Sequence, residues 1–375
     1  MKKIVFLTGT RADFGKIKPL LQEVEQHADF ELYVFVTGMH LQELYGYTLI
    51  EIQRCKFTHI HTFENHTHES TMDLTLAKTI EGFSAYCQSL QPDLIVVHGD
   101  RVETLAGAIV GSLNNFLVAH IEGGELSGTV DELIRHSVSK LCHLHFVSHA
   151  EAAKRLLQMG EANDSIFEIG SPDLDSMFSK HLPSLETVKS YYEIPFDNYA
   201  ILLFHPVTTE INQMESHAQQ LVNALLADSQ NYIVVYPNND MGNQYIFSAY
   251  EALRNHPRFK LFPSLRFEYF LQLLQQAEFI IGNSSAGIRE APGYGVSAIN
   301  IGTRQHNRAA HPCIHNVSYE QEAILSAIKT IPSHTTRQFA SQQFGAGRSA
   351  QLFMQALTNS AFWQHSAQKQ FRDSQ

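Results

Sequence analysis

Three carboxylates in the first half of the chain occupy positions suited to proton transfer. Asp100 and Glu122 lie in glycine-containing turns, each directly after a short hydrophobic run, and Asp131 opens an amphipathic segment. Surface carboxylates without a specific role normally lie on solvated helix faces. These carboxylates lie in turns flanked by glycine, where the backbone can pass close to a bound molecule. Asp131 alone would be an ordinary helix N-terminal residue. Together, the three predict general acid and base chemistry.

Two turns of small residues could hold an anion. The first, Thr8 to Lys16, has neither Walker A nor GxGxxG spacing, so we expect Arg11 and helix-start amides to form its anion site. The second, Gly282 to Pro292, offers two hydroxyls and several amides at a helix start, which suits a diphosphate. Glu290, one turn further on, could reach a ribose hydroxyl. The expected ligand groups of this turn are Ser284, Ser285, Gly287 and Glu290.

Histidines provide one further candidate and one disfavoured interpretation. His205 directly follows the first strand of the second half, where a histidine is structural more often than catalytic. Two His-rich spots raise the question of a metal: His59, His61, His66 and His68, and then Cys142, His143 and His145. The first group is expected in a polar loop without acidic ligands at fixed spacing, and the last two histidines alternate as strand positions do. We therefore expect no metal at these two spots.

Strand-like and helix-like segments alternate twice along the chain, which predicts an α/β fold with two doubly wound parallel-sheet domains and a cleft between them. We expect domains at 1–178 and 179–348, followed by a C-terminal helix and tail at 349–375. The stretch Pro172 to Pro195 is the candidate linker, and Ser148 with Glu151 predicts a capping box. The expected first-half segments are 3–8, 16–27, 32–37, 72–90, 94–98, 101–113, 116–120, 131–140, 143–147 and 166–169. The expected second-half segments are 200–204, 212–227, 232–236, 244–255, 260–262, 267–276, 279–282, 286–291 and 298–301.

Composition excludes several classes of protein. The 375 residues are 44% hydrophobic and 17% charged, as in ordinary globular proteins, and no apolar run approaches the length of a membrane span. The net charge of −11 repels nucleic acid and anionic lipid, so an anionic ligand needs locally placed donors. The four cysteines form no CxxC pair, and the charged residues after Leu7 interrupt a signal-peptide pattern, so we expect a cytoplasmic protein.

The motifs resemble those of the hydrolysing UDP-N-acetylglucosamine 2-epimerases of bacterial sialic-acid and capsule pathways. The resemblance covers residues 4 to about 310 in order and rests on GTRAD, HGDR, HIEGGE-SGTVDE, HPVTTE, GNSSAGIREAP and GTRQ-NR. It implies two Rossmann-like domains in the glycosyltransferase B arrangement, no nicotinamide or metal, and release of UDP and N-acetylmannosamine. HPVTTE at 205–210 disfavours the non-hydrolysing branch, which has a His-Arg-Arg-Glu-Asn motif there.

Carried over by position, the resemblance implies roles for eleven residues. The catalytic set is Asp100, Glu122, Asp131 and His205, and the substrate-binding set is Arg11, Arg101, Ser284, Ser285, Gly287, Glu290 and Arg304. One carboxylate would remove the C2 proton as UDP leaves, giving a glycal, and another would protonate C2 from the opposite face as water adds at C1. Which carboxylate is base and which is acid stays open.

Three other functions fit parts of the pattern. The nearest is a hydrolysing 2-epimerase of a UDP-diacetamido-trideoxy sugar in legionaminic acid synthesis, which shares all the motifs. A glycosyltransferase is disfavoured because three grouped carboxylates serve proton transfer, and a silent nucleotide-sugar sensor is disfavoured because those carboxylates would oppose an anionic diphosphate. We expect a UDP-sugar as the ligand, no nucleic-acid or membrane partner, and a homo-oligomer, either dimer or tetramer.

Overall fold

The computed structural model describes residues 1–66, 71–331, 343–370 and 372. By its internal contacts the chain forms two units. Unit 1 comprises Met1–Glu125, Asp131–Ser179 and Gln343–Gln375, and unit 2 comprises Leu126–Val130 and Lys180–Gln342. The first residues of the expected linker, up to Ser179, thus belong to unit 1, as does the described part of the C-terminal segment. The domain limits expected from the sequence remain a prediction.

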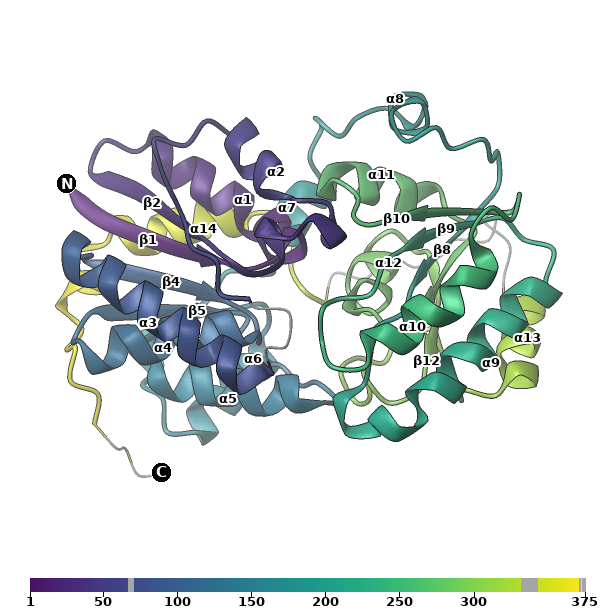
Figure 1. The fold of residues 1–375 in the computed structure, drawn as a ribbon. Coiled ribbons are helices and arrows are strands. Elements are labelled where there is room, and N and C mark those ends of the chain that lie inside the picture. The colour runs from purple at the N-terminus through teal and green to yellow at the C-terminus, as the bar shows by residue number, and fades with distance from the viewer. Residues whose placement is uncertain (67–70, 332–342, 371, 373–375) are drawn as a thin grey trace. The chain divides into compact units, whose positions relative to one another are not determined.

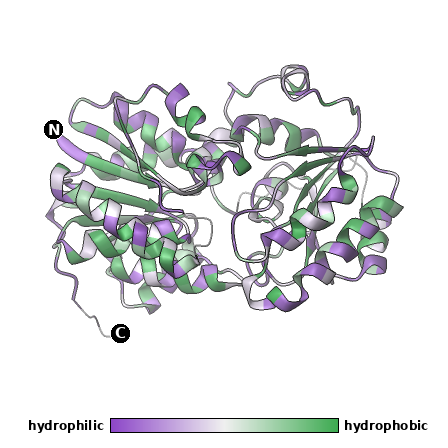
Figure 2. Cartoon of the chain, viewed as in Figure 1, coloured by the Kyte–Doolittle hydropathy of each residue, from purple (hydrophilic) through white to green (hydrophobic). Residues whose placement is uncertain are grey.

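Unit 1 contains a seven-stranded parallel sheet in the order β3-β2-β1-β4-β5-β6-β7. The order reverses direction beside β1, as in a Rossmann fold, and β1 pairs with both β2 and β4. The central strands β1 and β4 carry runs of buried apolar residues because both faces of the sheet are covered (Figure 2). The strand bounds are β1 Lys2–Thr8, β2 Phe30–Val36, β3 His59–Thr62, β4 Leu94–His98, β5 Leu117–Ile121, β6 Leu144–Val147 and β7 Ile166–Glu168.

Helices cover both faces of this sheet (Figure 1). Alternate strand residues such as Phe6 and Val96 pack against Ile17 of α1 and Phe353 of α14, and all four side chains are buried. The C-terminal helix α14 therefore completes the core of unit 1. The main helices of unit 1 are α1 Arg11–Gln26, α2 Leu49–Arg54, α3 Met72–Leu90, α4 Val102–Leu113, α5 Val130–Leu141, α6 Ala150–Gln158, α7 Asp173–Met177 and α14 Ser349–Thr358.

Unit 2 repeats the plan with a six-stranded parallel sheet in the order β10-β9-β8-β11-β12-β13. The strands are β8 Ala200–Leu203, β9 Tyr232–Val235, β10 Phe259–Phe262, β11 Phe279–Gly282, β12 Ser297–Ile301 and β13 Ile314–Val317. The helices are α8 Leu185–Tyr191, α9 Met214–Ala227, α10 Asn243–Tyr250, α11 Phe267–Gln276, α12 Glu290–Gly293 and α13 Gln321–Thr330. Two parallel-sheet α/β units confirm the predicted fold class.

The topology itself identifies the loops that can carry a site. In doubly wound sheets, ligands bind at the carboxyl ends of the strands where the strand order reverses. That point lies between β1 and β4 in unit 1 and between β8 and β11 in unit 2. The segments that follow these strands contain Arg11, at the start of α1, and Asp100 in unit 1, and His205 and Ser284 in unit 2.

Several local predictions were wrong. His149, not Ser148, caps α6 by accepting a hydrogen bond from the Ala152 amide, because the Ser148 hydroxyl donates to Glu125 instead. Helix α1 starts at Arg11, five residues before the predicted start. The expected helix 286–291 is instead a short 3-10 turn, η6 Ser285–Gly287, followed by α12. Strands β3 and β13 and helices α2 and α13 were not predicted.

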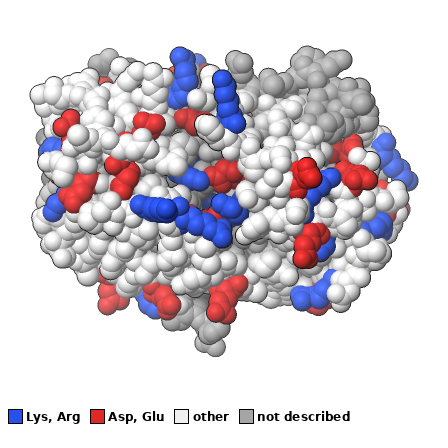
Figure 3. All heavy atoms as spheres, turned by 90° about the horizontal axis from the view of Figure 1, so that it is seen from above, with Lys and Arg blue, Asp and Glu red and all other residues white. Residues whose placement is uncertain are grey.

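Two features bear on possible partners. Within the described part of the chain, no helix combines the length and apolarity that crossing a membrane requires. On the face shown in Figure 3, Lys and Arg side chains are interspersed with Asp and Glu side chains.

Candidate active site

Glu122 is a buried carboxylate at the end of β5, and its side chain is 3% exposed. Its Oε1 atom accepts a hydrogen bond from the Ser171 hydroxyl at 3.0 Å and lies 3.3 Å from Nε2 of His98. The ammonium of Lys16 is 3.9 Å from the same oxygen and 3.6 Å from the fully buried Asp173 carboxylate. Glu122 is thus a carboxylate among polar neighbours from three other elements, which suits a group that exchanges protons.

Asp100 lies in the turn after β4, with its side chain 21% exposed. Its Oδ2 atom pairs with the guanidinium of Arg135, an almost fully buried arginine on α5. The same guanidinium donates to the backbone carbonyl of Glu122 at 2.7 Å. The structure therefore brings Asp100 and Glu122 together around one arginine. Asp131 occupies the first turn of α5, one helical turn before Arg135.

The two predicted arginines of unit 1 stand at helix starts. Arg11 is the first residue of α1, and Arg101 is the N-cap residue of α4. Nε of Arg101 lies 3.5 Å from the buried carboxylate of Glu103. Arginines at these positions can meet an anion with a planar pair of donors, as the sequence predicts, and their contact with substrate remains a prediction.

Three amides at the start of α1 take part in a capping box, and the anion site expected there remains a prediction. Thr10 and Asp13 make a capping box, in which the Asp13 carboxylate accepts from the Gly9 and Thr10 amides and the Thr10 hydroxyl accepts from the Asp13 amide. Burial raises the pKa of Asp13, although hydrogen bonds from Thr8 and Gly9 act in the opposite direction. The amides of Gly9, Thr10 and Asp13 thus serve the capping box.

In unit 2, one buried asparagine holds two motif loops together. Asn283, after β11, accepts from the His205 amide at 2.7 Å and donates to the His205 carbonyl at 2.8 Å. The backbone can pass this closely because Gly282 has φ +133 and a Cβ there would lie 1.8 Å from the Leu203 carbonyl oxygen. Nδ1 of His205 accepts from the Asn238 amide, so the neutral ring carries its proton on Nε2.

The remaining predicted residues of unit 2 lie around the same asparagine. Arg304 donates to the Asn283 carbonyl at 3.3 Å. Ser284 caps η6 by accepting from the Ala286 amide, and Ser285 and Gly287 are the first and last residues of that turn. Glu290, at the start of α12, is 2% exposed. The structure thus brings His205, Ser284 and Arg304 together at one switch point, and their roles remain predictions.

Burial keeps two histidines of unit 1, His40 and His120, in the neutral form near pH 7. Nε2 of His120 donates to the Gly99 carbonyl at 2.8 Å, and Nδ1 accepts from Ser139 at 3.0 Å. Burial lowers the pKa of His120 to about 3, and burial also lowers the pKa of His40 to about 3. These rings therefore act as fixed hydrogen-bonding groups and not as proton carriers.

These shifts predict an acid-sensitive unit 1. Below pH 6.5 the unfolded chain binds a proton at each ring, whereas the folded chain does not until about pH 3, so the free energy of unfolding falls as the pH falls through this window. Each ring contributes about 1.4 kcal/mol per pH unit. We expect His120→Gln to reduce the slope of unfolding free energy against pH by one proton, measured by urea unfolding from pH 7 to 5. An unchanged slope would show that His120 titrates normally in the folded chain.

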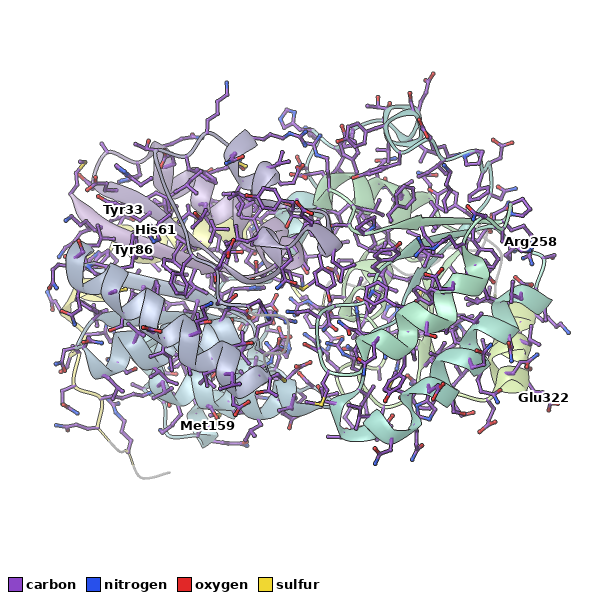
Figure 4. All side chains as sticks on the ribbon, viewed as in Figure 1. Tyr33, His61, Tyr86, Met159, Arg258 and Glu322 are labelled. Atoms are coloured by element: carbon purple, nitrogen blue, oxygen red, sulfur yellow. The ribbon has the colours of Figure 1, made fainter. Side chains whose placement is uncertain are left out.

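The histidine clusters differ from expectation in one respect. His59 and His61 lie on the edge strand β3, not in a polar loop, and His59 lies 3.2 Å from Glu31. His61 stacks on Tyr86 and His59 stacks on Tyr33. Figure 4 labels His61, Tyr33 and Tyr86, which lie in the same part of unit 1. His68 lies outside the described residues. Among the residues that the structure describes, no three His, Cys, Asp or Glu side chains are grouped to hold a metal ion.

Sequence reasoning missed the residues that surround the predicted carboxylates. Arg135 had a visible signal, because it follows Asp131 by four residues and so lies on the same helix face. Lys16 belongs to the first small-residue turn and was not singled out. Asp173 and Ser171 lay at or near the expected linker, and nothing in their local sequence indicates contact with the Glu122 region. Asn283 stood within its motif, but its pairing with His205 spans 78 positions.

The fold and these side chains define a two-unit α/β protein with carboxylates, histidines and arginines at the carboxyl ends of its strands. The profile of the family described as UDP-N-acetylglucosamine 2-epimerase matches residues 22–358. A Neisseria meningitidis serogroup B protein named UDP-N-acetylglucosamine 2-epimerase is 49% identical over 377 residues, covering 100% of this chain and 99% of that protein. The chain therefore belongs to the UDP-N-acetylglucosamine 2-epimerase family, as its motifs indicated.

Two more distant proteins are also similar. A Legionella pneumophila protein named UDP-N,N'-diacetylbacillosamine 2-epimerase (hydrolyzing) is 33% identical over 361 residues, covering 95% of this chain and 96% of that protein. The solved structure of the Methanocaldococcus jannaschii UDP-GlcNAc 2-epimerase, in complex with UDP-GlcNAc and UDP, has a TM-score of 0.83 at 21% identity and covers 96% of this chain and 99% of that one. The shared fold thus extends over both units.

Proposed function

We propose that this protein is a hydrolysing UDP-N-acetylglucosamine 2-epimerase, which converts UDP-N-acetylglucosamine and water to UDP and N-acetylmannosamine. The observation that carries the proposal is 49% identity, along the whole chain, to the Neisseria protein of that name. Identity to the Legionella enzyme for the diacetamido sugar is 33%, which ranks that substrate second. The side chains of unit 1 supply an independent chemical reason.

The chemistry requires a base, an acid and stabilisation of a leaving diphosphate. The C2 proton of the sugar is not acidic, but departure of UDP gives C1 oxocarbenium character and makes that proton removable. Glu122 and Asp131 are the proposed proton-transfer pair, and Asp100 assists or orients. A proton removed from C2 gives a glycal, and a proton returned to the opposite face of C2, with water adding at C1, gives the 2-epimer.

We assign nucleotide binding to unit 2 together with two arginines of unit 1. Ser284, Ser285 and Arg304 provide donors for the diphosphate, and His205 offers Nε2–H to the diphosphate or to a carboxylate. Gly287 keeps the turn free of a side chain, and Glu290 accepts from the ribose. Arg11 and Arg101 oppose the negative charge that develops on the leaving UDP.

The direct test is to identify the sugar that is released. The protein is incubated with UDP-N-acetylglucosamine and, separately, with a UDP-diacetamido-trideoxy sugar, and the products are followed by NMR. We expect free N-acetylmannosamine and UDP from the first substrate at the higher kcat/KM. Faster turnover of the second substrate would replace the proposed substrate, and release of N-acetylglucosamine would mean simple hydrolysis.

Ser285→Ala and Arg11→Ala should weaken UDP binding by about 1 to 3 kcal/mol, the value of a charge-assisted hydrogen bond, or roughly 5- to 150-fold in Kd. Calorimetry with UDP measures this directly. Ser326→Ala, an exposed serine on α13 of the same unit, is the matched control and should leave Kd unchanged. Parent-like affinity in both site variants would place the diphosphate elsewhere.

We also propose, from the family resemblance, that the protein works without a cofactor as a cytoplasmic homo-oligomer, a dimer or a tetramer. The domain limits at residues 178 and 348 belong to the same proposal. Light scattering of the purified protein tests the oligomeric state.

A further inference from the structure

Arg135 occupies an unusual place for an arginine. It is 1% exposed, and its two terminal nitrogens have different partners. Nη1 donates to the backbone carbonyl of Glu122 at 2.7 Å, and Nη2 pairs with the carboxylate of Asp100. A buried arginine is costly unless its donors are used, and here both terminal nitrogens bind strand-end loops that carry proposed catalytic carboxylates.

Helix α5 connects the third carboxylate to the same point. Asp131 and Arg135 are four residues apart and so share one helix face, and Ser139 continues that face one turn later. Ser139 contacts Nδ1 of His120, whose Nε2 donates to the carbonyl of Gly99, next to Asp100. Arg135 and Ser139, one helical turn apart, therefore connect this face of α5 to β5 and to the turns that follow β4 and β5.

The backbone of Glu122 needs such an anchor. Its φ of +65 is in the left-handed region, which a residue with a Cβ adopts only when its surroundings hold it there. The Glu122 amide donates to the Phe146 carbonyl at 2.9 Å, and the Glu122 carbonyl accepts from Arg135. The peptide groups on both sides of the Glu122 Cα are thus fixed, which sets the direction of its side chain.

We infer that Arg135 is a positioning residue, whose guanidinium fixes Asp100 and Glu122 relative to each other and to Asp131 on its own helix. The inference rests on the proposed function, because it assigns these carboxylates to proton transfer. Lysine keeps the positive charge, but its single ammonium group cannot reproduce the fixed, planar arrangement of two donor nitrogens by which a guanidinium binds two acceptors. Arg135→Lys therefore separates the charge from the geometry.

The test compares Arg135→Lys with Arg258→Lys in the full-length protein. Arg258, labelled in Figure 4, donates to the carbonyls of Leu225, Leu226 and Gln230 in unit 2 and contacts none of the proposed catalytic carboxylates. We expect Arg135→Lys to lower kcat by roughly 10²-fold, the lower range for a displaced acid or base. KM and the calorimetric Kd for UDP should stay within about threefold, and Arg258→Lys should keep parental kcat.

A double-mutant cycle distinguishes positioning from general support of the fold. If Arg135 acts through Asp100, Arg135→Lys should cost far less in kcat when added to Asp100→Asn than when added to the parent. Equal costs in both backgrounds, or kcat within threefold of the parent, would overturn the inference. If the parent converts a different UDP-sugar, the proposed substrate fails, and the same ratios measured with that sugar still decide the role of Arg135.

Discussion

Glu122→Gln should lower turnover by roughly 10² to 10⁴, the usual contribution of a positioned acid or base, while UDP affinity stays within several-fold. Glutamine keeps the shape of the side chain and can still accept from Ser171, which donates to Oε1 in the parent. It cannot take up or release a proton. Asp131→Asn should show the same separation between turnover and UDP binding.

Glu125→Gln is the matched control for this prediction. Glu125 lies three residues along the same loop and is equally buried, but its carboxylate accepts from Ser148 and has no proposed role in catalysis. Turnover is measured by UDP release and affinity by calorimetry for all three variants. Parental turnover in Glu122→Gln would remove that residue from the mechanism. If Glu125→Gln lost as much turnover as Glu122→Gln, the loss would come from disturbance of the loop and not from the missing acid or base.

The sequence was informative about the fold because short strands in a parallel sheet are almost wholly apolar. The runs at 94–98 and 279–282 match β4 and β11 in full. The carboxylate sites followed from the same pattern, since parallel strands all end at one edge of the sheet. Strand β3 escaped prediction because its edge position leaves His59 and His61 half exposed, so its sequence lacks the apolar run.

Contacts between distant residues set the limit of sequence reasoning. The failed capping box at Ser148 shows this, because its hydroxyl had a competing acceptor in Glu125, 23 positions away. The arginine that joins Asp100 to Glu122 is 35 positions from the first of them. By contrast, the capping box of Thr10 and Asp13 involves residues only three positions apart. Its threonine-x-x-aspartate pattern is visible in the sequence and indicates a helix that starts at Arg11.

In heavy water, the released N-acetylmannosamine should carry one deuterium at C2. Elimination followed by hydration breaks the C2–H bond and the C1–O bond, so the proton returned to C2 comes from a group that has exchanged with solvent. We expect nearly every product molecule to carry deuterium at C2. Simple hydrolysis, or transfer of the intact sugar, would introduce no deuterium there. NMR of the isolated sugar reads this directly.

Oxygen labelling tests the other bond. In ¹⁸O-water the label should enter the C1 hydroxyl of the sugar and not UDP, because water adds at C1 after the diphosphate has left with its own oxygen. A substrate deuterated at C2 should also react more slowly where proton removal limits turnover, although slow product release hides that effect. Product that retains its original hydrogen at C2 would show that Asp100, Glu122 and Asp131 do not epimerise the sugar. The carboxylates would then serve hydrolysis or glycosyl transfer at C1.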